Sequence, residues 1–194
     1  MAKTATTGFS YRKSLVGLEH PAQVDILLAG SATVKIGDLV RVNTSGLLVR
    51  AATGEVFGGV LVGIVDQNGI NVFSSRATGT SGATLTPDDQ IATASDNATN
   101  AAKNLKGQVV LDVSGSNLWF NDADSALAQT NLFQFFDVAN GNQVTVGSAS
   151  DANGQVQLIA IDPDGDGDLS KGLFRLNETQ FNAGVDTGTA KNAA

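Results

Sequence analysis

Four aspartates alternate with proline and glycine within one segment of the chain, residues 162–168. They are Asp162, Asp164, Asp166 and Asp168. Carboxylates at alternate positions, with glycine in the sixth place, match the first half of an EF-hand-type calcium loop. The second half does not match, because Leu173 occupies the twelfth place, where a bidentate Glu belongs. The segment therefore indicates a turn with local aspartate hydrogen bonds, and a weak or partner-completed calcium site is the alternative.

Other residue types that carry out catalysis do not form a set. His20 is the only histidine, and no nucleophile motif accompanies it. Gly58-Gly59 and the loop from Gly79 to Gly82 lack the lysine of a phosphate-binding loop. Carboxylate pairs such as Asp88-Asp89 are too common to indicate a glycosidase. We predict no catalytic residue and no cofactor apart from the calcium alternative.

Composition excludes several classes of protein. The chain has 194 residues, no cysteine and a net charge of −7. Without cysteine it forms no disulfide, iron–sulfur or zinc–thiolate site. No apolar run approaches the ~18 residues of a membrane helix, and the first eight residues hold no apolar stretch typical of a signal peptide. The acidic balance disfavours non-specific binding to nucleic acid, which needs clustered Lys and Arg.

Charge is distributed unevenly along the chain. Residues 1–50 carry a net charge of +3, whereas residues 107–170 contain nine aspartates and no Lys or Arg. A basic front and an acidic back can pair within one chain or between neighbouring copies. A solvent-facing acidic surface that keeps the protein soluble explains the pattern equally well.

The N-terminal segment, residues 1–20, is predicted to be an extended arm. Its first seven residues are small and polar, and aromatic and basic residues then alternate closely: Phe9, Tyr11, Arg12 and Lys13. Such a segment cannot fold alone, so we expect it to order on a partner or on the body of the protein. These four residues are our candidates for a contact with a partner or a neighbouring copy.

Short strands with regular turns are predicted between residues 21 and 182. Alternating residues 31–43 and 47–51 form a hairpin around Ser45-Gly46. Further strands are expected at 56–65, 107–113, 117–120, 144–146, 156–161 and 173–177. With no long helical period, this pattern predicts an all-β, mainly antiparallel barrel or sandwich with at most one or two short helices.

Three segments remain less regular. Residues 74–104 form a long polar loop excursion, and residues 183–194 form a small, polar tail that we expect to be flexible. Residues 124–137 fit a short helix or a transition from helix to strand. The large aromatic residues of the acidic half suit a core better than a subunit interface. They are Trp119, Phe120, Phe133, Phe135, Phe136 and Phe174.

The chain resembles the capsid decoration proteins of tailed bacteriophages, also called cement or auxiliary head proteins, of the type found in marine phages. The resemblance rests on strand and turn patterns at 34–40, 46–50, 58–65, 105–109 and 154–161, and it extends from about residue 24 to 182. It implies a compact β-barrel or β-tulip-like body. It also implies a virion protein, assembled in the host cytoplasm, that binds the outside of the mature head. Such proteins sit at three-fold or quasi-three-fold points as homotrimers and cement neighbouring major capsid subunits.

Two other classes compete with this hypothesis. One is a different virion component, such as a head fibre base or a tail protein. The other is a calcium-dependent surface or adhesion module, which the aspartates of 162–168 would serve. An enzyme fits less well than either. We expect no direct contact with nucleic acid and none with a membrane.

Overall fold

The computed structural model describes residues 8–15, 23–29, 33–65, 68–69, 91–92, 105–111, 116–151 and 153–177. The strands of the first half are β1 (Ser10–Ser14), β2 (Gln23–Leu27), β3 (Thr33–Val34), β4 (Leu39–Val42), β5 (Leu48–Arg50), β6 (Gly59–Val65) and β7 (Ile91–Ala92). Those of the second half are β8 (Lys106–Leu111), β9 (Asn117–Asp122), β10 (Phe135–Phe136), β11 (Val138–Ala139), β12 (Gln143–Val144), β13 (Val156–Ile161) and β14 (Lys171–Leu176). Two 3-10 helices, η1 (Gln129–Asn131) and η2 (Val146–Ser148), complete the described elements. The all-β, mainly antiparallel fold predicted from the sequence is confirmed.

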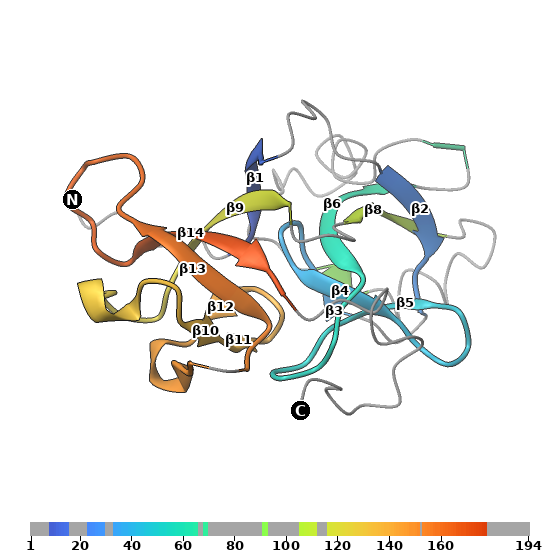
Figure 1. Ribbon diagram of the computed structural model, residues 1–194. Coiled ribbons are helices and arrows are strands. Elements are labelled where there is room, and N and C mark those ends of the chain that lie inside the picture. The colour runs from blue at the N-terminus through green and yellow to red at the C-terminus, as the bar shows by residue number, and fades with distance from the viewer. Residues whose placement is uncertain are drawn as a thin grey trace.

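Two five-stranded sheets form the body. The first sheet has the order β2-β8-β6-β4-β5, and the second has the order β1-β9-β14-β13-β10. Figure 1 shows them side by side, with β1 and β9 in the second sheet close to the first. The pairs β11–β12 and β3–β7 lie beside them. The fold therefore separates most of the chain before residue 112 from most of the chain after it, with β1 as the exception.

The first sheet follows the predicted hairpin. β4 pairs with β5 through Arg41 and Val49, and Gly46 adopts a positive φ of 76° in the turn between them. A Cβ on Gly59 would overlap the carbonyl oxygen of Val110, so this strand position requires glycine for the close approach of β8. One parallel bridge, between Leu28 and Leu48, joins the two outer strands of this sheet. The enclosed side chains form one hydrophobic cluster: Leu28, Ala29, Val34, Val40, Leu48, Leu61, Ile64, Leu105 and Val109.

A second hydrophobic cluster joins the two sheets. From the first sheet and its loops come Leu39, Ala51, Phe57, Val60 and Val110, and the second sheet supplies Trp119, Val156, Leu158, Phe174 and Leu176. Trp119, Phe136 and Phe174 are completely buried, which confirms the core prediction for these three aromatic residues. Phe133 differs, because 65% of it is exposed.

The chain passes from one sheet to the other after β8. The predicted strand at 117–120 is present, and so is the described part of the strand at 107–113, but β8 pairs with β2 and β6 while β9 pairs with β1 and β14. Residues 124–137, left open between helix and strand, contain the short helix η1 and then β10. Of the predicted excursion at 74–104, only Ile91–Ala92 lies within the described residues, and the tail at 183–194 lies outside them.

Candidate functional site

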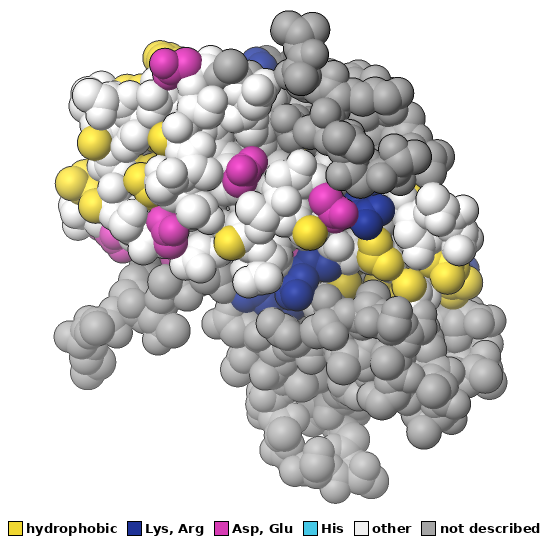
Figure 2. Space-filling model, turned by 90° about the horizontal axis from the view of Figure 1, so that it is seen from below, with side chains coloured by type: hydrophobic (Ala, Val, Ile, Leu, Met, Phe, Trp, Pro, Cys, Tyr) yellow, Lys and Arg dark blue, Asp and Glu magenta, His cyan; other side chains and the backbone are white. Residues whose placement is uncertain are grey.

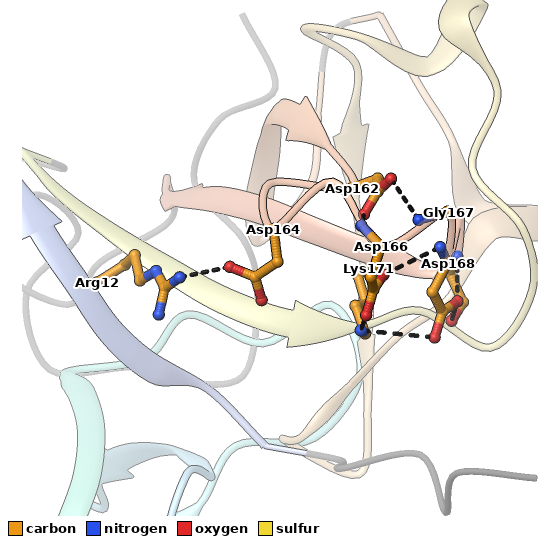
Figure 3. Close-up of polar contacts among 8 residues, drawn as sticks. Arg12, Asp162, Asp164, Asp166, Gly167, Asp168 and Lys171 are labelled. Carbon is orange, nitrogen blue, oxygen red and sulfur yellow. Dashed lines mark hydrogen bonds and ion pairs between the residues drawn. The ribbon is translucent and has the colours of Figure 1, made fainter. Parts of the chain in front are cut away.

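The aspartate loop between β13 and β14 is organised by its first residue. Asp162 has a positive φ of 46°, and its carboxylate accepts hydrogen bonds from the backbone N–H groups of Asp166 at 3.0 Å and Gly167 at 2.9 Å. These are local aspartate-to-backbone bonds that close a turn. Figure 3 shows the carboxylate of Asp162 directed back into the loop.

The other three carboxylates of the loop form ion pairs with basic residues. Asp164 pairs with Arg12 of β1, and Asp166 pairs with the ammonium group of Lys171, which is 3% exposed as a residue. Asp168 lies 3.9 Å from the same ammonium nitrogen and accepts a 2.6 Å hydrogen bond from the Ser170 hydroxyl. Lys171 hydrogen-bonds Asp166 and lowers the pKa of its carboxyl to about 2, and Ser170 lowers the pKa of Asp168.

The arrangement supplies the loop with its own cation. In Figure 3 the Lys171 ammonium lies between Asp166 and Asp168. Within the described ranges, no group of three or more His, Cys, Asp or Glu side chains is arranged to hold a metal ion. Lys171 was not among the site residues predicted from the sequence. Its position as a single basic residue after a run of acidic residues is the feature that could have indicated it.

The four arm residues have different environments. Phe9 is 3% exposed and packs edge-on against Phe174 at 6.4 Å between ring centroids, so it belongs to the core rather than to an exposed contact surface. Tyr11 is half-buried and packs edge-on against Trp119 at 5.7 Å. The Arg12 side chain is 54% exposed, and Lys13 is exposed as well. Residues 10–14 of the arm thus form β1 on the body itself, paired with β9.

A buried chain of polar side chains connects the arm to both sheets. The backbone N–H of Gly8 donates to the side-chain oxygen of Asn121 at 3.0 Å, and the Asn121 amide donates to the carbonyl of Asn142 at 2.9 Å. The Asn142 amide donates in turn to a carboxylate oxygen of Asp38 at 2.9 Å. The other oxygen of Asp38 accepts from the backbone N–H of Lys35 at 2.8 Å. We call Asp38, Asn121 and Asn142 the polar chain.

Asp38 is the ionisable member of the polar chain. It has no exposed surface, and burial raises its pKa from 3.8 to about 6. The hydrogen bonds from Lys35 and Asn142 and the charges of Arg50 and Lys35 oppose this shift without cancelling it. The carboxyl group therefore gains a proton in weakly acidic solution.

Gln155 forms a second buried connection between the sheets. Its side-chain oxygen accepts from the backbone N–H groups of Gly54 at 3.1 Å and Val138 at 2.8 Å. Its amide nitrogen donates to the carbonyls of Ala52 at 3.2 Å and Glu55 at 2.6 Å. Three of these partners belong to the loop after β5, which is distant from Gln155 in the sequence, and Val138 belongs to the second half of the chain. Gln155 therefore fixes that loop against the second half of the protein.

The surface carries charges of both signs. In Figure 2 Lys and Arg side chains gather near the middle of that face, and the acidic side chains are scattered over it, one of them beside a basic side chain. The ion pair of Arg12 with Asp164 joins the basic front to the acidic back of one chain, across 152 residues. His20 and the pair Asp88-Asp89 lie outside the described residues.

Comparison with protein-family models, with curated proteins and with solved structures finds no match. Among the described residues, no helix has the length and hydropathy that crossing a membrane requires.

Proposed function

We propose that this protein is a capsid decoration protein, which binds the outer surface of the mature head of a tailed bacteriophage and bridges neighbouring major capsid subunits. The observation that carries the proposal is the position of β1. This basic strand lies at one edge of the second sheet, fixed to the body by Phe9, and it presents Arg12 and Lys13 at the surface. A strand anchored in this way offers a partner pre-ordered contacts, which lowers the entropic cost of binding.

The organisation of the body is consistent with mechanical bridging. The polar chain and Gln155 connect the sheets to each other and to the arm. A body connected in this way transmits force between the subunits it contacts. Assembly as a homotrimer belongs to the same proposal, because several copies of a modest contact raise the effective affinity for a lattice.

Co-sedimentation with heads tests this function. Purified protein is mixed with expanded heads and, separately, with procapsids of the encoding phage, and the bound fraction is measured over a range of protein concentrations. We expect saturable binding to expanded heads and none to procapsids. Absence of binding to expanded heads would refute the decoration function and direct attention to the tail and fibre components.

A charge-reversal variant tests the contribution of β1. The double variant Arg12→Glu/Lys13→Glu should bind expanded heads more weakly than the wild type. Lys106→Glu is the matched control, because Lys106 lies on β8 of the first sheet and is half-buried. Equal binding by the wild type and the double variant would remove β1 from the contact surface.

A further inference from the structure

The described end of the arm is held by a short segment between β3 and β4, residues 35–38. The N–H of Phe9 donates to the carbonyl of Gly37 at 2.8 Å. Gly37 has a φ of +91°, and a Cβ at this position would lie 2.8 Å from the Cα of Gly8. The two backbones are therefore in direct contact, and position 37 requires glycine for the arm to lie there. We call residues 35–38 the clasp.

Asp38 ends the clasp and is linked to the same arm residues by the polar chain. The N–H of Gly8 donates to Asn121, Asn121 donates to Asn142, and Asn142 donates to the Asp38 carboxylate. The carboxylate has no exposed surface, and the arm covers the residue that precedes it. Departure of the arm uncovers that residue and removes the first link of the polar chain, so we expect it to bring water closer to the carboxylate.

The basic residues around Asp38 compensate its burial only in part. Arg50 of β5 and Lys35 of the clasp favour the charged carboxylate, and so do the hydrogen bonds from the Lys35 N–H and the Asn142 amide. Burial is nevertheless the largest effect, and it raises the pKa to about 6. An ionised Asp38 therefore lies in a site that favours the neutral acid.

Other ionisable side chains on the elements around this carboxylate have partners elsewhere or point away from it. Arg41 of β4 forms an ion pair with Glu55 of the loop after β5, and Arg12 of the arm forms one with Asp164. Asp122 lies on the opposite face of β9 from the polar chain, because side chains alternate along a strand. β6 contains no ionisable residue. Within the described part of the chain, the two basic residues named above are therefore the charges that act on the carboxylate.

We propose that the clasp is a pH-dependent latch for the arm, which holds Gly8 and Phe9 when the Asp38 carboxyl is protonated and releases them more often when it is ionised. The cause is that a carboxylate is more favourable in water than in a buried site, and release of the arm hydrates it. Release also frees the N–H of Phe9 and the carbonyl of Gly37, which a partner can then bind. The latch is a property of the free chain and does not depend on the proposed decoration function.

The expected change in arm release follows from the linkage between proton binding and conformation. The closed state binds the proton of Asp38 more tightly than the released state does, so release increases as the pH rises. A difference of one in pKa between the two states corresponds to a tenfold change in their equilibrium. For a released-state pKa between 3.8 and about 5, release should become about five- to tenfold more frequent from pH 5 to pH 7.

Amide hydrogen exchange of the full-length protein tests the latch. The protection factors of the Gly8 and Phe9 N–H groups are measured at pH 5 and pH 7, each corrected for the intrinsic exchange rate at that pH. Both should be lower than those of the amides of β14, the central strand of the second sheet, because the arm opens without global unfolding. They should fall about five- to tenfold from pH 5 to pH 7.

Two variants separate Asp38 from other causes of a pH dependence. Asp38→Asn cannot ionise, so the protection of its arm amides should not change between pH 5 and pH 7. Asp164→Asn is the matched control, because it removes the ion pair of Arg12 on the arm and leaves the clasp intact. Its arm amides should show the same five- to tenfold change as those of the wild type.

The titration of Asp38 itself tests the latch in the opposite direction and still decides the matter if Asp38→Asn does not fold. Followed by the ¹³C NMR shift of its Cγ, the carboxyl should titrate near pH 6 in the wild type. Its midpoint should be lower in Phe9→Ala, whose arm loses the ring contact with Phe174.

Three results would overturn the latch. The first is an equal Asp38 midpoint in the wild type and Phe9→Ala. The second is arm protection that stays constant or rises from pH 5 to pH 7 in the wild type. The third is exchange of the arm amides at the rate of the β14 amides, because the arm would then open only together with the whole fold.

Discussion

Titration of Asp38 gives a direct test of the buried connection between the two sheets. The carboxyl has no exposed surface and a pKa of about 6, compared with 3.8 for a solvated aspartate. Because the pKa is raised in the folded state, the folded protein binds the proton more tightly than the unfolded chain does. The contribution of Asp38 to stability is therefore greatest below pH 3.8, falls as the pH rises through 6, and is constant above about pH 7.

The magnitude follows from the shift. A change from 3.8 to about 6 is worth about 3 kcal/mol, and about 2.4 kcal/mol of it is lost between pH 4 and pH 7. Urea unfolding, followed by the fluorescence of Trp119, measures this loss, because Trp119 is the only tryptophan and is completely buried. The variant Asp38→Asn removes the titrating group, so the free energy of unfolding of the wild type should fall by that amount relative to the variant.

Comparing the pH profile of the wild type with that of Asp38→Asn separates the titration of Asp38 from the titration of other acidic residues. Burial also raises the pKa of Asp137, which acts in the same direction, whereas Asp166 and Asp168 have lowered values and lose their contribution only as the pH falls below about 4. All three remain in Asp38→Asn. Asp124→Asn, at an exposed position, is the matched control and should follow the wild type. Parallel pH profiles for the wild type and Asp38→Asn would show that Asp38 is not held as an unfavourable buried charge, and the reasoning would be wrong.

Three further predictions concern stability. Phe133 has a φ of +65°, which asparagine tolerates better than phenylalanine, so Phe133→Asn should raise the free energy of unfolding by about 1 kcal/mol. A variant that unfolds at a lower urea concentration than the wild type would contradict the inference of backbone strain at this residue. Gln155→Leu should lower the free energy of unfolding by about 2 kcal/mol or more, because four backbone partners lose their hydrogen bonds. Gln157→Leu, which loses one exposed hydrogen bond, should lower the free energy of unfolding by less. Lys171→Met should be less stable than the wild type at pH 7, and this difference in stability should disappear as the pH falls from 4 toward 2. A difference in stability that does not depend on pH would exclude the ion pairs as its cause.

Local pattern was sufficient to predict most of the longer strands, but it predicted neither β1 nor β2, and it did not predict which strands pair. The hairpin of β4 and β5 followed from alternating residues around Ser45-Gly46, because both the strands and the turn lie within 20 residues. The assignment of β8 and β9 to different sheets depends on long-range pairing, of β9 with β14 for example. Alternation marks which face of a strand is buried and carries no information about which distant strand lies beside it.

The candidate site was partly predictable for a related reason. The alternating aspartates of 162–168 indicated a turn, and the structure shows Asp162 closing it, but the ion pairs with Arg12 and Lys171 were not predicted. Nothing in the sequence indicated the roles of Asn121, Asn142 and Gln155, because an isolated amide side chain is typical of a surface residue. Their roles arise where two sheets meet, a place that no single segment defines.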